Sequence, residues 1–267
     1  MKRLQQRYRY SLILLKQLVK TDFKLRYQGS FLGYLWSLLR PLALFVILYI
    51  VFARFLRFGE AVPNFPVYLL FGIVLWNYFV EVTSNSVSAI VGKGDLIRKL
   101  NFPKYVIIMS GSLSALINLG INMIVLAAFM WFTGVDLRIE ALLLPIVLAE
   151  LFVFALALAF LLSALFVKFR DITYIWEVVL QAGFYATPII YPLSLIPDIA
   201  AKLLLLSPVA QIIQDARYLL ITPETTTLSQ LYGTHLVRLI PLSVILVICI
   251  FSVTYFRKRS KYFAEEV

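Results

Sequence analysis

Charged residues are scarce in this chain: 15% of its 267 residues are Asp, Glu, Lys or Arg, and 61% are hydrophobic. Soluble domains carry about 25% charged residues. A soluble protein with so few charges could not cover this much apolar surface, so most of the chain must be surrounded by lipid. The net charge of +11 is therefore expected to act at the membrane surface, beside lipid headgroups or a cytosolic partner, and not on nucleic acid.

Other absences narrow the chemistry. The single cysteine, Cys249, cannot form a disulfide within the chain, and the single histidine, His235, has no neighbouring residues with which to hold a metal. No Gly-x-x-x-x-Gly-Lys-Ser/Thr loop is present, so the chain is not expected to bind or hydrolyse ATP itself. A membrane-embedded glycosyl- or phosphotransferase would need acidic residues clustered at one membrane face. The loops on one side offer only Asp95 and Asp171, far apart in sequence, so this alternative is less favoured.

Six apolar runs are long enough to cross a bilayer as helices, which takes about 20 residues. They are residues 33–56, 65–91, 104–132, 141–167, 172–191 and 236–256. No alternating strand pattern appears, and in lipid a helix satisfies its own backbone groups. The sequence therefore predicts an all-α integral membrane protein with six transmembrane helices.

The distribution of Lys and Arg sets the orientation. One side holds eight of them in residues 1–28, four in 92–104, two in 168–171 and four in 257–261. The opposite connections hold six, which are Arg54, Arg57, Arg138, Lys202, Arg217 and Arg238, together with six acidic residues. Because positive residues are enriched on the cytoplasmic side, both termini are predicted to be cytoplasmic.

Residues 8–28 precede the first apolar run and form an amphipathic pattern. Lys16, Lys20 and Lys24 recur every four residues along one side, and apolar residues occupy another. The pattern indicates a helix that lies in the membrane interface with its lysines toward the headgroups. A soluble helix packed on a partner is the alternative.

Residues 193–220 are apolar but interrupted by Pro197 and Pro208, and they follow Pro188 and Pro192. The pieces are too short to span a membrane and too apolar to be free loops. Proline cannot continue a helix and so bounds each piece. We therefore expect a re-entrant hairpin of two short helices that dips back from the outer side.

Polar residues repeat on single faces of three predicted spans. The stripes are Asn77, Glu81, Ser84, Asn85 and Ser88 in the second, Ser110, Ser114, Asn118 and Asn122 in the third, and Glu177 and Gln181 in the fifth. Such stripes often join helices to one another, and this reading is favoured for the third span. A carboxylate in lipid needs a partner or water, so Glu81, Glu150 and Glu177 are candidates for a functional interior.

Arg40 lies inside the first span, directly before Pro41. Its side chain either reaches back to the inner headgroups or faces an anionic headgroup or diphosphate that enters from the inner leaflet. The second reading has a chemical basis, because a guanidinium binds phosphate oxygens through paired charge-assisted hydrogen bonds.

Three motifs in order resemble the ABC-2 type exporter permeases of the polysaccharide branch, which includes the membrane subunits of O-antigen and teichoic-acid exporters. They are Arg26-Tyr27-x-x-Ser30-x-Leu32-Gly33-x-x-Trp36 followed by Pro41-Leu42, then Leu96-Ile97-Arg98-Lys99-x-x-Phe102-Pro103-Lys104, and Arg170-Asp171-Ile172 followed by Thr187-Pro188, Tyr191-Pro192 and Pro197. The resemblance covers essentially the whole chain.

This resemblance implies a subunit of the bacterial cytoplasmic (inner) membrane that carries no cofactor of its own. It implies a homodimer bound to two copies of a separate ATPase, which would hold ATP and Mg²⁺. The expected substrate is a glycan, either O-antigen or teichoic acid, linked to a polyprenyl diphosphate. An ABC-2 exporter of drugs or small lipids is the alternative within the class.

The candidate site residues fall into four groups. A coupling helix over 93–101 would contact the ATPase through Lys93, Asp95, Leu96, Ile97, Arg98, Lys99, Leu100, Phe102 and Lys104. The substrate entrance would use Lys24, Arg26, Tyr34, Trp36 and Arg40. The channel would be lined by Phe45, Tyr49, Phe52, Phe184 and Tyr185, whose rings either stack on sugars or fill helix packing. The 193–220 hairpin would be an extracellular gate, with Pro188, Pro192, Pro197 and Pro208 at its bends.

Overall fold

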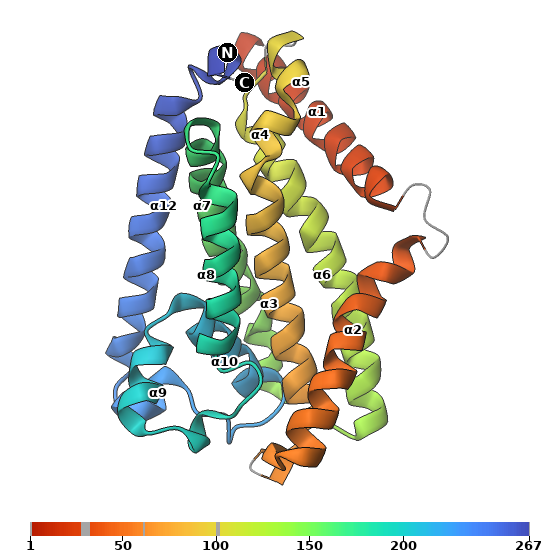
Figure 1. Cartoon of the computed structure of the whole chain (residues 1–267), viewed down its shortest axis with the longest axis vertical. Helices are drawn as coiled ribbons and strands as arrows, with labels where there is room; N and C mark the ends of the chain where they lie inside the picture. Colours follow the sequence, from red (N-terminus) through yellow and green to blue (C-terminus); the bar gives the residue numbers. More distant parts are fainter. Residues whose placement is uncertain (1, 28–32, 61, 100–101, 267) are drawn as a thin grey trace.

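The computed structural model describes residues 2–27, 33–60, 62–99 and 102–266, and Figure 1 shows their arrangement. Every regular element within these ranges is a helix. The prediction of an all-α membrane protein is therefore confirmed for the described part of the chain.

Among the described residues, five helices, three of them extended by a 3₁₀ or π turn, are long and apolar enough to cross a membrane: Trp36–Phe55, Phe65–Val87, Tyr105–Thr133, Ile139–Lys168 and His235–Arg259. They contain α2 (Trp36–Tyr49) with the π-helical turn η2 (Ile50–Phe55), α3 (Phe65–Val87), α6 (Tyr105–Thr133), η4 (Ile139–Leu143) with α7 (Leu144–Lys168), and η6 (His235–Arg238) with α12 (Leu239–Arg259). These five match the predicted spans at 33–56, 65–91, 104–132, 141–167 and 236–256 to within a few residues.

The shorter elements lie between and beside them. They are α1 (Lys2–Tyr27), η1 (Gly33–Leu35), η3 (Phe58–Glu60), α4 (Ala89–Gly92), α5 (Gly94–Lys99), α8 (Ile172–Ala186), η5 (Leu193–Leu195), α9 (Asp198–Leu205), α10 (Pro208–Leu220), α11 (Leu228–Tyr232) and α13 (Phe263–Glu266).

The predicted span 172–191 is shorter in the structure. Helix α8 has 15 residues and ends at Ala186, which corresponds to about 22 Å at 1.5 Å per residue. The hydrocarbon core is about 30 Å thick. Thr187 precedes Pro188 and adopts an extended backbone with ψ 135°, because a proline disfavours helical geometry in the residue before it.

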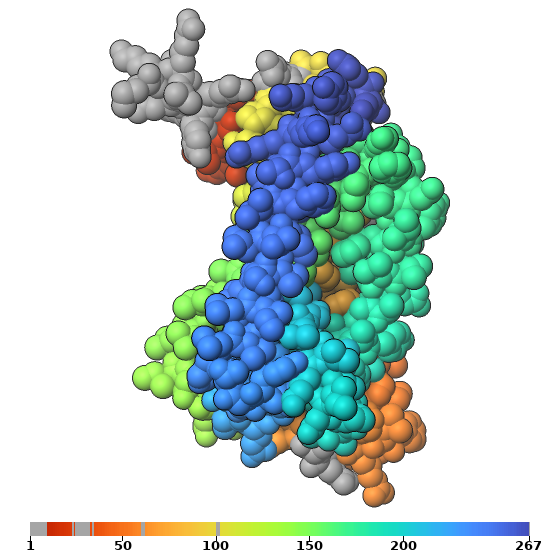
Figure 2. Space-filling view, turned by 90° about the vertical axis from the view of Figure 1, so that its left-hand side faces the viewer, coloured from red at the N-terminus to blue at the C-terminus, as the bar shows by residue number. Residues whose placement is uncertain are grey.

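Helix α3 is the centre of the molecule. Its most apolar window is 78% buried, against 11% for Trp36–Phe55 and 17% for His235–Arg259. Helices α2, α6, α7, α8 and α10 all contact it, and α12 packs on α7, where it covers one face along most of the molecule's length (Figure 2). The outward faces of the peripheral helices are left for lipid or another chain.

The two ends of the molecule differ in content. The start of α1, the short α5 and the C-terminal α13 lie at one end, and α9 and α10 lie at the other (Figure 1). Helix α13 contacts α5 and α7, and its Phe263 is fully buried. The hairpin is thus on the face opposite to the coupling segment, as the charge count implied.

Candidate functional site

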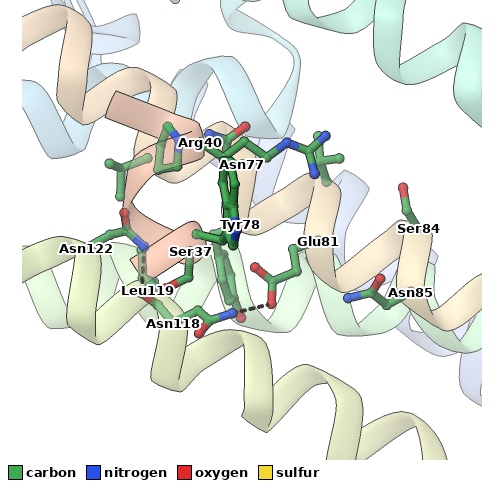
Figure 3. Close-up of a pocket in the computed structure, with 14 residues that line it drawn as sticks. Ser37, Arg40, Asn77, Tyr78, Glu81, Ser84, Asn85, Asn118, Leu119 and Asn122 are labelled. Atoms are coloured by element: carbon green, nitrogen blue, oxygen red, sulfur yellow. Dashed lines mark hydrogen bonds between the residues drawn. The ribbon is translucent and has the colours of Figure 1, made fainter. Parts of the chain in front are cut away.

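A cavity of about 520 Å³ opens between α2, α3 and α6 (Figure 3). It is lined mainly by polar side chains: Ser37, Arg40, Asn77, Tyr78, Glu81, Ser84, Asn85, Asn118 and Asn122, with Trp36, Pro41, Val74, Val80 and Leu119 completing the wall. The helical repeat explains why polar side chains gather here, because residues spaced by three and four positions share one face of α3 and one face of α6. The sequence predicted both stripes but not that they meet opposite Arg40.

Glu81 is held in place by the neighbouring helix. The side-chain amide of Asn118 donates a hydrogen bond of 2.9 Å to Glu81 Oε1, and the amide of Asn122 donates one of 2.9 Å to the Asn118 carbonyl. The stripe on α6 therefore does join helices, as favoured from the sequence. It also orients a carboxylate toward the cavity.

Four groups in this cavity remain available. Arg40 and Asn85 are exposed, Asn77 and Ser84 are half-buried, and none of the four has a hydrogen bond or ion pair with another described residue. Tyr78 also lines the cavity; it is 2% exposed, and its hydroxyl finds no partner in the described structure. Polar groups at membrane depth are costly unless water or a ligand satisfies them, so the arrangement suits a polar ligand.

The predicted entrance residues fall partly within this cavity. Arg40 and Trp36 both line it, and Trp36 is 54% exposed. Lys24 is exposed on α1. The side chains of Arg26 and Tyr34 lie outside the described part of the structure. Their joint role as an entrance stays a prediction.

The coupling segment contains the six-residue helix α5 (Gly94–Lys99), within the 93–101 predicted, and residues 100–101 lie outside the described part of the structure. Asp95, Arg98 and Lys99 are exposed on it and could contact another chain. Ile97 and Phe102 are each 3% exposed, so their side chains pack within this chain. Leu96 and Lys104 are half-buried, and Leu100 lies outside the described residues.

Lys93 contacts its own chain and not a free surface. Its Nζ donates hydrogen bonds of 2.9 Å to both carboxylate oxygens of Asp22 on α1, and Ser110 Oγ on α6 donates one of 3.0 Å to Asp22 Oδ2. Three elements thus meet at one carboxylate. The sequence did not predict this junction; the one signal in it is that Asp22 is the only acidic residue in the basic segment 1–28.

The predicted hairpin corresponds to α9 and α10, which meet at an angle of 101° and form either a broken span or a re-entrant loop. Pro197 immediately precedes α9 and Pro208 begins α10. Helix α9 exposes Ile199 and Leu203, at 76% and 64%. In contrast, almost every residue of α10 is buried.

Arg217 fixes α10 to the rest of the molecule. Its guanidinium donates hydrogen bonds to the carbonyl oxygens of Tyr68 (3.0 Å), Pro188 (2.6 Å) and Ile189 (2.8 Å), and it lies over the Tyr68 ring at 3.5 Å. Arg217 is 0% exposed. The charge count from the sequence included Arg217 among the positive residues of the outer connections. That was wrong for the surface charge, because the side chain of Arg217 is buried.

A second polar contact holds the other side of α10. Arg238 of η6 donates a hydrogen bond of 2.8 Å to Asp215 Oδ1, and Gln211 donates one of 2.6 Å to Asp215 Oδ2. Because Asp215 is 4% exposed, breaking this contact would leave a buried carboxylate without compensation. Any motion of the hairpin is therefore easier for α9 than for α10.

The five predicted channel aromatics do not form one cluster. Phe45 is 7% exposed and packs edge-on against Phe129, next to Tyr49, and Phe52 lies against Phe58. Phe184 packs on Trp76, whereas Tyr185 is 61% exposed. Phe45 and Tyr49 are on α2, Phe52 is on the adjoining turn η2, and the other two are on α8; both α2 and α8 pack on α3.

The exposed face of α8 is unusual for a helix in lipid. Glu177 and Gln181 are exposed on it, flanked by Tyr174 at 70% and Tyr185 at 61% exposure. A carboxylate and an amide on a lipid-facing surface would each cost several kcal/mol. This face therefore fits a water-filled passage or another chain better than hydrocarbon.

Comparison with known proteins agrees with this architecture. The sequence model of the ABC-2 type transporter family matches residues 13–221. The chain is similar to the O-antigen export system permease protein RfbA of Myxococcus xanthus, with 34% identity over 73% of this chain and 74% of the relative. It is similar to a protein of the same name from Klebsiella pneumoniae, at 28% over 85% and 88%, and to the polysialic acid transport protein KpsM of Escherichia coli, at 24% over 77% and 80%.

Because the family match covers well over half of the chain, this protein belongs to the ABC-2 type transporter family.

Proposed function

We propose that this ABC-2 type transporter subunit forms the membrane passage of an exporter of lipid-linked polysaccharide, of the O-antigen or teichoic-acid kind, in the bacterial cytoplasmic membrane. The polar cavity beside Arg40 is the observation that carries the proposal. Relatives named for O-antigen and polysialic acid support the polysaccharide. The diphosphate of a polyprenyl carrier would bind at Arg40, whose guanidinium has no partner among the described residues.

The passage would form between two copies of the chain. Helix α8 supports this, since its face with Glu177 and Gln181 has no neighbour in the described part of one chain and suits water better than lipid. Tyr185 on the same face could stack on successive sugars without binding any of them tightly. The apolar face of α9 at the outer end would limit the exit.

The energy would come from two copies of a separate ATPase subunit, which would bind ATP and Mg²⁺. Helix α5 supports a docking role, because Asp95, Arg98 and Lys99 are exposed at the end of the molecule that also carries the start of α1. By the positive-inside rule this end is cytoplasmic.

Reconstitution tests the proposal. The purified chain alone in liposomes should hydrolyse no ATP, and together with its ATPase it should hydrolyse ATP and carry a fluorescent undecaprenyl-diphosphate oligosaccharide across the bilayer. ATP hydrolysis by the isolated chain would contradict the division of labour. Transport of a cationic dye, with no transport of the glycan lipid, would favour the drug-exporter alternative.

A further inference from the structure

We propose that the cavity between α2, α3 and α6 selects the first sugar of the substrate, the one joined to the carrier phosphate. Arg40 would bind the phosphate, and Asn77, Glu81 and Asn85 would bind hydroxyl groups of that sugar. The inference rests on the proposed function and goes beyond it, because it makes this cavity a specificity site for a phosphosugar and not a general anion site.

The mixture of donors and acceptors carries the argument. A phosphate accepts hydrogen bonds but donates none at neutral pH, so a site for phosphate alone needs cations and N–H groups. This cavity places the carboxylate of Glu81 and the carbonyl groups of several amides beside one arginine. A carboxylate repels phosphate but accepts from a hydroxyl, and each amide both donates and accepts, which matches a hydroxyl group.

The geometry separates the two kinds of group. Arg40 extends from α2, and Glu81, Ser84 and Asn85 extend from α3, around the same hollow (Figure 3). Glu81 is oriented by the 2.9 Å hydrogen bond from Asn118. A preoriented acceptor loses little entropy when a ligand binds, which makes it suited to discrimination between hydroxyl positions.

Size limits the ligand to a short piece of the substrate. The cavity volume is about 520 Å³, within the range of roughly 300–1,000 Å³ that small-molecule sites occupy. One sugar with its phosphate fits such a space, and a polymer does not. The rest of the glycan would therefore pass without specific contact here.

Binding of paired probes to the complete complex with its ATPase tests the inference. The probes are dodecyl diphosphate and the same molecule bearing N-acetylglucosamine, glucose or galactose, measured by native mass spectrometry in nanodiscs. At least one sugar probe should bind more tightly than the bare diphosphate. Asn85→Ala should weaken the binding of that probe about three- to tenfold, which is the effect of one hydrogen bond. The affinity for the bare diphosphate should change less than about twofold.

Two further variants define the controls. Arg40→Gln should weaken the binding of all probes, because every probe carries the phosphate. Ser88→Ala, on an exposed side chain one turn beyond Ser84 and outside the cavity, should change none of them.

The outcomes separate the inference from the proposed function. Equal binding of bare and sugar probes, or an equal loss for all probes in Asn85→Ala, would overturn the inference and leave a site for lipid phosphate alone. If the complex carried long-chain glycan normally with that result, the proposed function would stand. Sugar-selective binding by a complex that transports no glycan would instead support the site and contradict the function.

Discussion

Arg217 and Arg40 lie in the apolar body of the same chain and have opposite surroundings. Arg217 is fully buried, and its guanidinium donates to three backbone carbonyls and to Gln214 Oε1 while it covers the Tyr68 ring. Arg40 is exposed in a cavity and has no such contact with any described residue.

The difference distinguishes a structural arginine from one available to a ligand. A guanidinium whose donors are occupied by carbonyls cannot also bind phosphate, and it holds α10, the end of α8 and α3 in one arrangement. A guanidinium without partners contributes little to the fold but can bind an anion at full strength. The half of the molecule around α10, where Arg217 joins α10 to α3 and to the end of α8, is thus closed and fixed. The half around α2, which contains the cavity with Arg40, is open.

Replacing Arg217 with methionine should have the largest effect. The carbonyl groups of Tyr68, Pro188 and Ile189 would lose their donor while still buried, and each buried unsatisfied group costs about 1–3 kcal/mol. We expect a loss of about 3 kcal/mol or more, seen as little monodisperse protein after detergent extraction. Gly72→Ala should act similarly, because a Cβ at that position would collide with the Arg217 guanidinium.

The matched control is Arg54→Met. Arg54 is exposed and has no hydrogen-bonding partner in the described ranges, so it should leave extraction and melting temperature unchanged. Normal folding of Arg217→Met would show that the closed half does not depend on this contact. It would contradict the assignment of Arg217 as a structural arginine in contrast to Arg40.

The sequence predicted the helices and the polar stripes because both follow local periodicity. The sequence did not predict the arrangement where contacts between residues distant in the chain determine it. Nothing near Arg217 in sequence indicates that α10 would bury a cation against carbonyls at the ends of α3 and α8. The junction of Asp22 with Lys93 and Ser110 likewise joins residues 71 and 88 positions apart. The placement of Arg40 and Glu81 around one cavity depends on how α2 packs against α3, which periodicity does not specify.

A crosslink on α9 should stop export without unfolding the protein. Lys202 lies over the ring of Tyr232 on α11, 5.6 Å from its centroid, so cysteines at both positions can be joined by a short, reducible bifunctional thiol reagent in a Cys249→Ser background. If α9 moves to open the exit, crosslinked complexes should lose glycan transport and regain it on reduction. Each single-cysteine variant, treated with the same reagent, is the control.

Unimpaired transport with a complete crosslink would make α9 as static as α10. The closed half would then include the whole hairpin, and the exit would have to open elsewhere.

Arg40→Gln should reduce export while leaving the fold intact. One charge-assisted interaction is worth about 1.5–3 kcal/mol, so glycan transport should fall roughly ten- to a hundredfold, with melting temperature and ATPase assembly unchanged. Arg40→Lys keeps the charge but not the paired hydrogen-bond geometry. We expect its transport rate to lie between those of the unchanged protein and of Arg40→Gln. Normal export by Arg40→Gln at normal expression would assign Arg40 to the inner headgroups and leave the cavity without a phosphate ligand.

The ion pair of Asp22 with Lys93 should show the smallest effect on stability. The side chain of Asp22 is 24% exposed and that of Lys93 is 26% exposed, and partly solvated pairs contribute about 0–1 kcal/mol. Lys93→Met and Asp22→Asn should therefore each lower the melting temperature slightly. The exchanged pair, Asp22→Lys with Lys93→Asp, should restore it, because the Ser110 hydroxyl can accept a hydrogen bond as well as donate one. A double-mutant cycle on thermal unfolding measures this coupling. A loss as large as that of Arg217→Met would show that α1 is held as firmly as α10, and the half of the molecule around the cavity would then be no more open than the other.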